Sequence, residues 1–171
     1  RIEASLAKNS DKLARLIRDA ISSLALELCK NAERESREID ALVLTGNTAM
    51  LYLLTESSPL ALSRAPFAAD RLFGEEIDAL ALGIDILADG AKIYLPPCIS
   101  AFVGADTVCA LLSSELCDSE EPRMLVDIGT NGEMALWKDG NLSVCSTAAG
   151  PAFEGVGISM GMRGAVGAID K

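Results

Sequence analysis

The chain has 171 residues and half of them are hydrophobic, which is enough for one domain or two small lobes with a real core. Its formal net charge is −10, so we expect no nucleic-acid partner, because phosphate binding requires a basic surface. No apolar run could span a bilayer and no signal peptide opens the sequence, so we expect a cytoplasmic protein without membrane contact.

The five cysteines are scattered without a CxxC pair, and the chain has no histidine. We therefore expect no zinc finger and no iron–sulfur cluster held by these residues. Catalytic triads that depend on histidine are excluded. Any chemistry must use carboxylates, hydroxyls, backbone amides and a bound metal ion, and the cysteines are expected to be reduced, small apolar residues.

Residues 10–31 form the clearest predicted helix, and a charged, solvated connection is expected at 33–38. The apolar residues that recur at helical spacing are Leu13, Leu16, Ile17, Ala20, Leu24 and Leu28. Residues 41–45 are almost entirely apolar, which predicts a strand buried on both faces of a parallel sheet.

Gly46, Asn47 and Thr48 follow that strand and lead into a predicted helix at 49–54. Open α/β sheets place their ligands in such a strand–turn–helix connection, at the carboxyl end of the strand. Alternatively, Asn47 or Thr48 simply caps the helix. The two roles are compatible, and the sequence leaves both open.

The middle of the chain is less regular. Residues 57–69 contain two prolines and are expected to be irregular, whereas 75–82 are predicted to form a short helix that Gly83 stops, and 93–95 a strand. A further helix is predicted at 104–117, with Asp106 in its first turn. Its expected apolar face consists of Ala105, Val108, Cys109, Leu112 and Leu116. The polar residues 118–122 are the candidate boundary between two lobes.

The segment 123–160 predicts three strands followed by a helix. The strands are expected at 124–128, 133–138 and 142–147, and Asp139–Gly140 is the signature of a two-residue hairpin turn. Pro151 suits the first turn of the helix, where its missing N–H costs nothing.

Asp127 lies near the end of the first of these strands, directly before a glycine turn. The backbone N–H groups from Gly129 to Gly132 are expected to converge on one point, as in sites that bind phosphate oxygens. Asp127 could hold Mg²⁺ directly or through water, and Thr130 could add a hydroxyl. The alternative is a structural hairpin with an ordinary Asx turn.

A second loop of small residues, 146–150, precedes the predicted helix and could face the same ligand. Glu154 in that helix is expected only to compensate the helix dipole. The glycines at 155, 157 and 161 have the spacing GxGxxxG without a preceding strand, so a dinucleotide-binding Rossmann site is rejected.

Five segments together resemble the ATP-dependent reductive activators of corrinoid proteins, the RACo- and RamA-like family. They are GNTAMLYLL (46–54), LPPCISAFVGAD (95–106), LVDIGTNGEMAL (125–136), STAAGPAFEG (146–155) and GMRGAVGAI (161–169). The motifs are long, stand in the family's order and cover most of the chain from residue 41 onward. The helix at 10–31 matches only in character.

The resemblance implies the α/β fold of the actin, sugar-kinase and heat-shock-chaperone ATPase (ASKHA) superfamily, which is built from ribonuclease-H-like lobes. Residues 1–118 would be the C-terminal part of the first lobe, and 119–171 the start of the second, with DIGTNGE as the second phosphate motif. In this comparison Asp127 is the catalytic and Mg²⁺-orienting residue. The ATP-contacting residues would be Gly129, Thr130, Asn131, Gly132, Gly46, Asn47, Thr48, Thr147 and Gly150.

Activators of this family use ATP to drive an electron from an iron–sulfur cluster onto an inactive Co(II) corrinoid, which restores Co(I). The 2Fe-2S cluster is expected in a preceding region that this chain does not include. Partners would be a corrinoid protein or a corrinoid-dependent methyltransferase, and a homodimer is conceivable. Residues 1–40 contain no Asp-x-Gly-Thr motif and no adenosine loop follows, so this chain alone is expected to be an inactive piece of the ATPase.

Two other functions stay open at this point. One is a docking module that senses nucleotide and binds the corrinoid protein without hydrolysis, which the acidic surface and incomplete motifs favour. The other is a small-molecule kinase of the same fold, because a fold does not fix a function.

Overall fold

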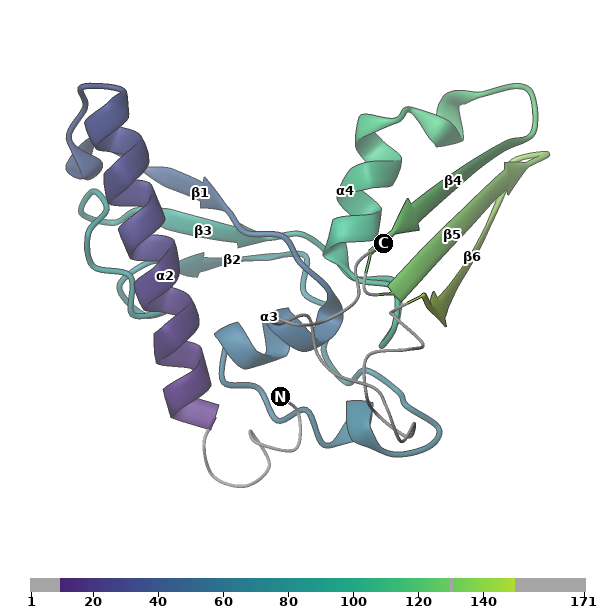
Figure 1. Cartoon of the computed structure of the whole chain (residues 1–171), viewed down its shortest axis with the longest axis horizontal. Coiled ribbons are helices and arrows are strands. Elements are labelled where there is room, and N and C mark those ends of the chain that lie inside the picture. Colours follow the sequence, from purple (N-terminus) through teal and green to yellow (C-terminus); the bar gives the residue numbers. More distant parts are fainter. Residues whose placement is uncertain (1–9, 130, 150–171) are drawn as a thin grey trace, which may run out of the picture. The chain divides into compact units, whose positions relative to one another are not determined.

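The computed structural model describes residues 10–129 and 131–149 (Figure 1). The chain divides into two compact units, Arg1–Glu115 and Leu116–Lys171, and each is described by itself. The predicted boundary lies three residues later, after residue 118. Within the described ranges, no helix combines the length and the apolar character needed to cross a membrane.

The first unit is a three-stranded sheet packed against helices. Strand β1 runs parallel to β3, β2 runs antiparallel to β3, and the strand order is β1-β3-β2. The elements are α2 (Ser10–Asn31), η2 (Ser36–Glu38), β1 (Ala41–Val43), α3 (Thr48–Leu54), η3 (Ala61–Ser63), β2 (Glu75–Asp78), β3 (Lys92–Leu95) and α4 (Ala105–Ser113), where η denotes a 3₁₀ helix.

The core of this unit is centred on β3. Its alternate residues Ile93 and Leu95 are completely buried, as expected for a strand with one face on a core. Leu51 of α3 belongs to the same cluster, and Ile17 and Ile21 of α2 pack against it. Figure 1 shows α2 running alongside the sheet, so a 22-residue helix covers the strands from one side.

The bounds predicted for α2 are confirmed, but the predicted apolar face is wrong. Leu16, Leu24 and Leu28 are exposed, and Leu28 is 68% exposed, whereas Ala14 is fully buried. The packed side also carries Arg18, whose guanidinium donates to the carbonyl oxygen of Leu54 at 2.8 Å and pairs with Glu56 at 2.8 Å. The helix therefore carries one apolar stripe that packs against the unit and another that is exposed. Arg18, which a periodic pattern would assign to the solvent-facing side, lies on the packed stripe.

Two predictions for the strands of this sheet are wrong. Residues 75–78 form strand β2 rather than a helix, because they pair with β3 in the register Glu75↔Leu95 to Asp78↔Lys92. Strand β1 is not buried on both faces, because it lies at the sheet edge and Val43 is exposed. Pairing partners decide strand formation and burial, and these partners lie 14 to 51 residues away in sequence.

Helix α4 is shorter than predicted, and its buried side differs from the predicted one. It ends at Ser113, and the buried positions are Ala105, Thr107 and Leu111, while Leu112 is exposed. Leu116 is buried but belongs to the separate 3₁₀ helix η4 (Leu116–Asp118) of the second unit.

The second unit is an antiparallel meander of β4 (Arg123–Ile128), β5 (Asn131–Lys138) and β6 (Asn141–Ala148). The three predicted strands and the hairpin turn are confirmed: Asp139 and Gly140 have φ angles of 51° and 74°, both in the left-handed region that this turn requires. The helix predicted after Pro151 lies outside the described residues.

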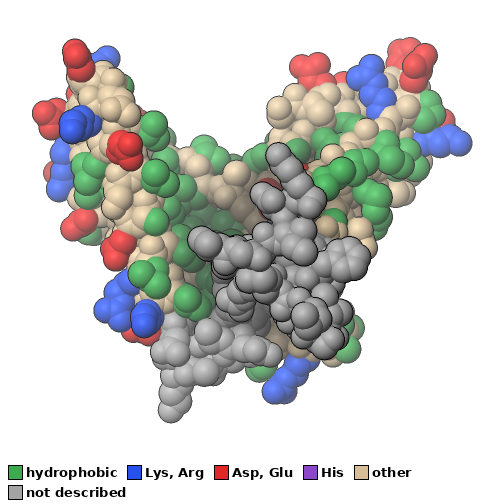
Figure 2. All heavy atoms as spheres, in the orientation of Figure 1, with side chains coloured by type: hydrophobic (Ala, Val, Ile, Leu, Met, Phe, Trp, Pro, Cys, Tyr) green, Lys and Arg blue, Asp and Glu red, His purple; other side chains and the backbone are tan. Residues whose placement is uncertain are grey.

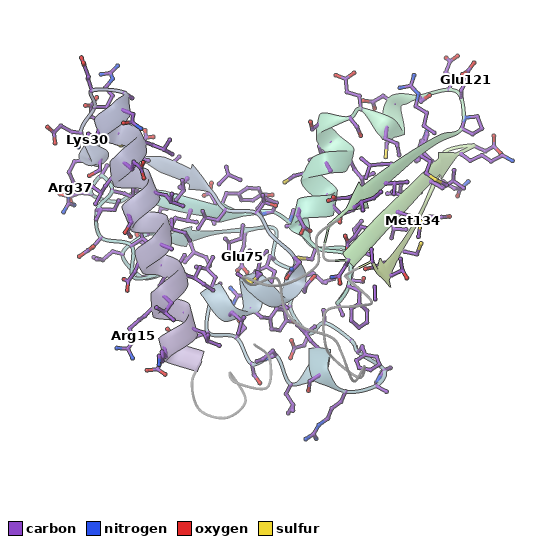
Figure 3. All side chains as sticks on the ribbon, in the orientation of Figure 1. Arg15, Lys30, Arg37, Glu75, Glu121 and Met134 are labelled. Carbon is purple, nitrogen blue, oxygen red and sulfur yellow. The ribbon has the colours of Figure 1, made fainter. Side chains whose placement is uncertain are left out.

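Strand β4 is largely exposed, although the mostly apolar run at 124–128 predicts a buried strand. Met124, Val126 and Ile128 are exposed, and Ile128 is 80% exposed. Met134 of β5, labelled in Figure 3, pairs with Val126 on the same face. Hydrophobic side chains gather over this sheet in Figure 2. Unlike these apolar side chains, the indole of Trp137 is held by a hydrogen bond: its N–H donates to the carbonyl oxygen of Ser119 at 2.9 Å.

Candidate functional site

A polar row crosses the three strands of the second unit. Asp127 of β4 lies opposite Glu133 of β5, and Glu133 lies opposite Ser146 of β6. Cross-strand partners point to the same face of a sheet, so these three side chains share one face. The hydroxyl of Ser146 donates to Glu133 Oε1 at 3.0 Å, and Asp127 is exposed to solvent.

The row contains two carboxylates in directly opposed positions. Like charges opposite each other destabilise an antiparallel pair unless a cation or hydrogen-bond donors compensate. Among the described residues no group of three metal-ligating side chains exists. Mg²⁺ needs fewer protein ligands, because it usually keeps several waters and combines one or two carboxylates with substrate phosphates. Asp127 and Glu133 therefore have the donor chemistry for such an ion.

The turn between β4 and β5 differs from the predicted phosphate cradle in one respect. The N–H of Gly129 donates to the carbonyl oxygen of Asn131 at 2.9 Å, so this donor is used inside the turn. A Cβ at Gly132 would lie 3.3 Å from Thr147 Cγ2, which explains a small residue there by packing against β6. Thr130 and Gly150 lie outside the described residues.

The register of β6 places the predicted site residue Thr147 on the face opposite to that of Asp127. Thr147 pairs with Gly132, and successive strand residues point to opposite faces, so Thr147 lies on the face away from Asp127. Ser146 lies on the face of Asp127 instead. The sequence placed both residues in one loop of small residues, and only the register of β6 separates them.

The second group of predicted residues lies in the first unit, at the start of α3. Asn47 caps this helix: its Oδ1 accepts a hydrogen bond from the N–H of Met50 at 2.9 Å. Thr48 is 1% exposed, and its hydroxyl donates to the carbonyl oxygen of Ser100 at 2.6 Å. The capping interpretation of Asn47 is confirmed. The hydroxyl of Thr48 is bound internally, so it holds the loop at residue 100 in place.

The loop before α4 is joined to residues 46–48. The carbonyl oxygen of Gly46 accepts from the N–H groups of Ala105 at 3.0 Å and Asp106 at 3.3 Å. Asp106 Oδ1 accepts from the N–H of Thr107 at 2.9 Å, so the first turn of α4 has these donors satisfied within the chain. The N-terminus of α4 is therefore closed by the protein itself.

Gly104 makes this junction possible. A Cβ at position 104 would lie 2.5 Å from Asn47 Cα and 2.8 Å from the backbone nitrogen of Thr48, distances that no side chain tolerates. The two loops consequently act as one structural element. In the sequence, residues 102–106 indicate a helix start and a family motif but not this contact. The glycine directly before the helix is the signal of a close backbone approach.

Cys98 lies below the same junction. Burial raises the pKa of the Cys98 thiol, and the neighbouring Thr48 hydroxyl and Ala105 N–H only partly oppose that change. A buried thiol with a raised pKa is protonated at neutral pH and therefore a poor nucleophile and metal ligand. Its role here is packing, as the sequence predicts for the cysteines.

Comparison with known proteins assigns both parts of the chain. Residues 1–119 match the family model described as the RACo middle region, and residues 121–171 match the model described as the C-terminal domain of RACo, the ASKHA domain. The chain is 35% identical over 160 residues to the corrinoid activation enzyme RamQ of Eubacterium limosum, which covers 94% of this chain and 26% of that protein. It is 38% identical over 103 residues to the Co(II) methylated amine-specific corrinoid protein reductase of Methanosarcina barkeri, which covers 60% and 17%.

A solved structure agrees with these matches. The reductive activator for corrinoid, iron–sulfur protein is 33% identical, with a TM-score of 0.82 over 95% of this chain and 27% of that one. The chain thus spans about a quarter of the length of these relatives. This similarity confirms the predicted ASKHA-type α/β fold. Both family models and the relatives agree that the chain belongs to the RACo family of corrinoid-protein reductive activators.

Proposed function

We propose that this chain is part of an enzyme that couples ATP hydrolysis to the reduction of an inactive Co(II) corrinoid protein to Co(I). The observation that carries the proposal is the 35% identity to a corrinoid activation enzyme over 94% of the chain. The carboxylate row of β4 and β5, in which Asp127 is exposed and Glu133 is half-buried, supports it, because it offers the ligands that a magnesium nucleotide needs.

Within this proposal the second unit handles the phosphates. Bound MgATP supplies the free energy for an otherwise unfavourable electron transfer. Asp127 holds the Mg²⁺ ion or one of its waters, and Glu133, oriented by the Ser146 hydroxyl, lies beside it on the same face. Backbone groups of residues 129–132 contact phosphate, with Thr130 as a further donor. Ser146 takes the place predicted for Thr147.

The first unit contributes a nucleotide-facing loop in this proposal. Gly46 and Asn47 are exposed enough to meet a ligand, and Asn47 keeps its Nδ2 group for it while Oδ1 caps α3. Thr48 acts as a positioning residue through its bond to the Ser100 carbonyl oxygen. Gly150 would belong to the phosphate loop of the other unit.

The lobe assignment is also a proposal. The ASKHA model begins its match at residue 121, two residues before β4, so we place β4–β6 at the opening of an ASKHA lobe. That position favours DIGTNGE as the first phosphate motif of the ASKHA domain rather than the second. Residues 1–119 match a model named for the middle region, and the assignment of residues 1–118 to an ASKHA lobe stays a prediction.

The electron and the partner complete the proposed reaction. One electron moves from a 2Fe-2S cluster held elsewhere in the full protein to Co(II), which becomes Co(I), while ATP is hydrolysed to ADP and phosphate. The substrate is a corrinoid protein or a corrinoid-dependent methyltransferase. The full protein is proposed to act in the cytoplasm. The proposed reaction can proceed in a homodimer as well as in a monomer.

A docking module without hydrolysis is the second candidate. The observation that favours it is that Gly129, Asn47 and Thr48 already use polar groups within the chain. Such a protein would bind its corrinoid partner in a nucleotide-dependent manner but release no phosphate.

Phosphate release and the cobalt spectrum distinguish these functions. The full protein, with its iron–sulfur region, is mixed with MgATP in the presence and absence of a Co(II) corrinoid protein. We expect stimulated hydrolysis together with formation of Co(I). A rate of ATP hydrolysis that is the same with and without the corrinoid protein would refute the activator function. Nucleotide-dependent binding without phosphate release would support the docking module.

Asp127→Asn tests the catalytic assignment. Because the substitution keeps the shape of an exposed side chain but removes its charge, turnover is expected to fall by about 100-fold or more while the unfolding transition stays in place. Asp139→Asn, an exposed aspartate in the hairpin turn, is the control. Activity of Asp127→Asn equal to that of the control would remove Asp127 from the site.

A further inference from the structure

Two phenylalanine rings stand exposed and in contact on the first unit. Phe67 is 43% exposed and Phe102 is 57% exposed, and their ring centroids lie 5.6 Å apart at an angle of 58°. They come from the loop after η3 and the loop before α4. The chain has only four phenylalanines, and Phe73 packs edge-on against Tyr52. Aromatic residues make up only 4% of the chain, so a solvent-exposed pair of phenylalanines indicates an interaction surface.

The pair is held in a fixed conformation. Phe67 has a φ of +57°, a left-handed conformation that is costly for a bulky residue and persists only where the surroundings enforce it. Its N–H donates to the carbonyl oxygen of Arg64 at 2.7 Å. On the other loop, the N–H groups of Phe102 and Val103 donate to the Ser100 hydroxyl at 3.3 and 3.2 Å. Preorganised rings lose little conformational entropy when a partner binds.

The geometry of the rings selects the kind of ligand. A nucleobase held between two rings needs them parallel and separated, whereas these rings are tilted and already touch. Exposed aliphatic side chains also stand next to these loops in the sequence: Leu60 directly before η3, and Ile99 in the loop before α4. Both features fit an aliphatic or aromatic side chain of another protein.

The charge beside the rings specifies the partner further. Arg64 belongs to the turn that presents Phe67, is exposed, and forms no ion pair within the described part of the chain. By contrast, Arg15, Arg18, Arg34, Arg37 and Arg71 each have a carboxylate partner. Arg123, in the second unit, is the other described arginine without one. An unpaired guanidinium in a chain of net charge −10 is available to an external carboxylate. Aromatic and arginine side chains together are typical of interface hot spots.

We propose that Arg64, Phe67 and Phe102 form a docking surface for a partner protein that presents an apolar side chain next to a carboxylate. Resting on the proposed function, the partner is the corrinoid protein. The surface adjoins residues 46–48, the proposed nucleotide loop. The Ser100 carbonyl oxygen accepts a hydrogen bond from the Thr48 hydroxyl, and Gly104 contacts Asn47. The same loop thereby carries both Phe102 and the contacts that hold residues 46–48.

The test measures binding of a Co(II) corrinoid protein to the full protein, together with its basal ATP hydrolysis. For Phe67→Ala and for Phe102→Ala we expect Kd to rise about 10-fold or more, and for Arg64→Ala about 3-fold or more with a weaker dependence on salt. Basal hydrolysis of Phe67→Ala is expected to stay within about 2-fold of the wild type, since this residue lies outside the nucleotide loop. Leu80→Ala removes an exposed leucine elsewhere in the same unit and serves as the control.

The outcomes separate this inference from the proposed function. If the wild type binds the corrinoid protein and both phenylalanine variants bind it equally well, the docking surface is refuted and the function stands. If Phe67→Ala lowers Tm by about 5 °C or more without changing Kd, the rings are covered by the rest of the full protein and the inference is likewise refuted. A wild type that neither binds nor responds to the corrinoid protein refutes the function, and this partner with it.

Discussion

The two units use their apolar residues in opposite ways. In the first unit, β3 alternates between the fully buried Ile93 and Leu95 and exposed residues, and a helix and loops close over the buried side. In the second unit, β4 carries Met124, Val126 and Ile128 on one face, and all three are exposed. The hydrophobic free energy depends on the area removed from water, so similar residues stabilise the first unit and contribute little in the second.

Polar contacts follow the same division. Tyr52 is completely buried, its hydroxyl donates to Asp70 Oδ1 at 2.5 Å, and it accepts from the N–H of Arg71 at 2.7 Å. Arg71 binds Glu75, labelled in Figure 3, and lies 4.9 Å above the ring of Phe73. This network fastens the loop after η3 to α3. The described part of the second unit relies on strand pairing, on the indole hydrogen bond of Trp137 and on the bond between Ser146 and Glu133. Asp127 on its carboxylate face is exposed.

The largest difference is expected between two isoleucines. Ile93→Ala removes a fully buried side chain and should lower the free energy of unfolding by about 2–5 kcal/mol, whereas Ile128→Ala should change it by no more than about 0.5 kcal/mol. Urea unfolding followed by circular dichroism reports on α2, α3 and α4, which belong to the first unit. Fluorescence of Trp137, the single tryptophan, reports on the second. Equal losses for the two variants would contradict the comparison.

Gly104→Ala is expected to cause the next largest loss in the free energy of unfolding. The added methyl group would overlap the backbone of Asn47 and Thr48, so we expect a loss of about 1–3 kcal/mol. Gly46→Ala is the matched control, because a Cβ there meets only Met50 Cβ at 3.6 Å, an ordinary contact. Chemical denaturation of both variants decides the matter, and a Gly104→Ala protein as stable as the control would show that the two loops can separate.

Tyr52→Phe should cost about 1–2 kcal/mol, because it leaves the Asp70 carboxylate and the Arg71 N–H without their shared hydroxyl. Tyr94→Phe, at the other, half-exposed tyrosine, is the control.

The same tyrosine predicts a dependence on alkaline pH. Burial, followed by the hydrogen bond to Asp70, raises the pKa of Tyr52 above its ordinary value of 10.0. A pKa raised in the folded state means that the stabilisation is complete below pH 10 and is lost as the pH rises through the higher folded value. Unfolding measured from pH 8 upward should lose stability less steeply in Tyr52→Phe than in the wild type, by about the contribution of one group. Identical slopes would argue against this titration.

Asn47 is expected to give the smallest effect on stability. Asn47→Ala removes the side-chain acceptor for the Met50 N–H and should cost about 1 kcal/mol, while Asn47→Asp keeps the cap. Thermal unfolding compares the two variants. Because Asn47→Asp retains the cap but replaces the amide by a carboxylate, reduced ATP affinity of this variant in the full protein would identify the separate ligand role. Unaltered affinity would leave Asn47 as a cap alone.

Local patterns sufficed wherever neighbouring residues decide the structure. The bounds of α2, the three strands of the second unit and the turn at Asp139–Gly140 were predicted because helical periodicity, strand alternation and turn chemistry are properties of short segments. Asp127 was predicted as a site residue from its place between a strand and a glycine turn, and this role stays a prediction. Ser146, which shares the face of Asp127, was not singled out, since the register of β6 decides which of two adjacent residues lies on that face.

The family motifs, the helix and hairpin signals and the exclusion of histidine chemistry can be read from the order of the residues alone. The folded chain is needed to see which stripe of α2 is packed, that residues 75–78 form a strand, and that Gly104 lies against Asn47. The physical reason is the distance along the chain over which each effect acts. Propensity and turn geometry act over a few residues, whereas burial, strand pairing and close backbone contact depend on partners such as residues 47 and 104, which only the folded chain brings together.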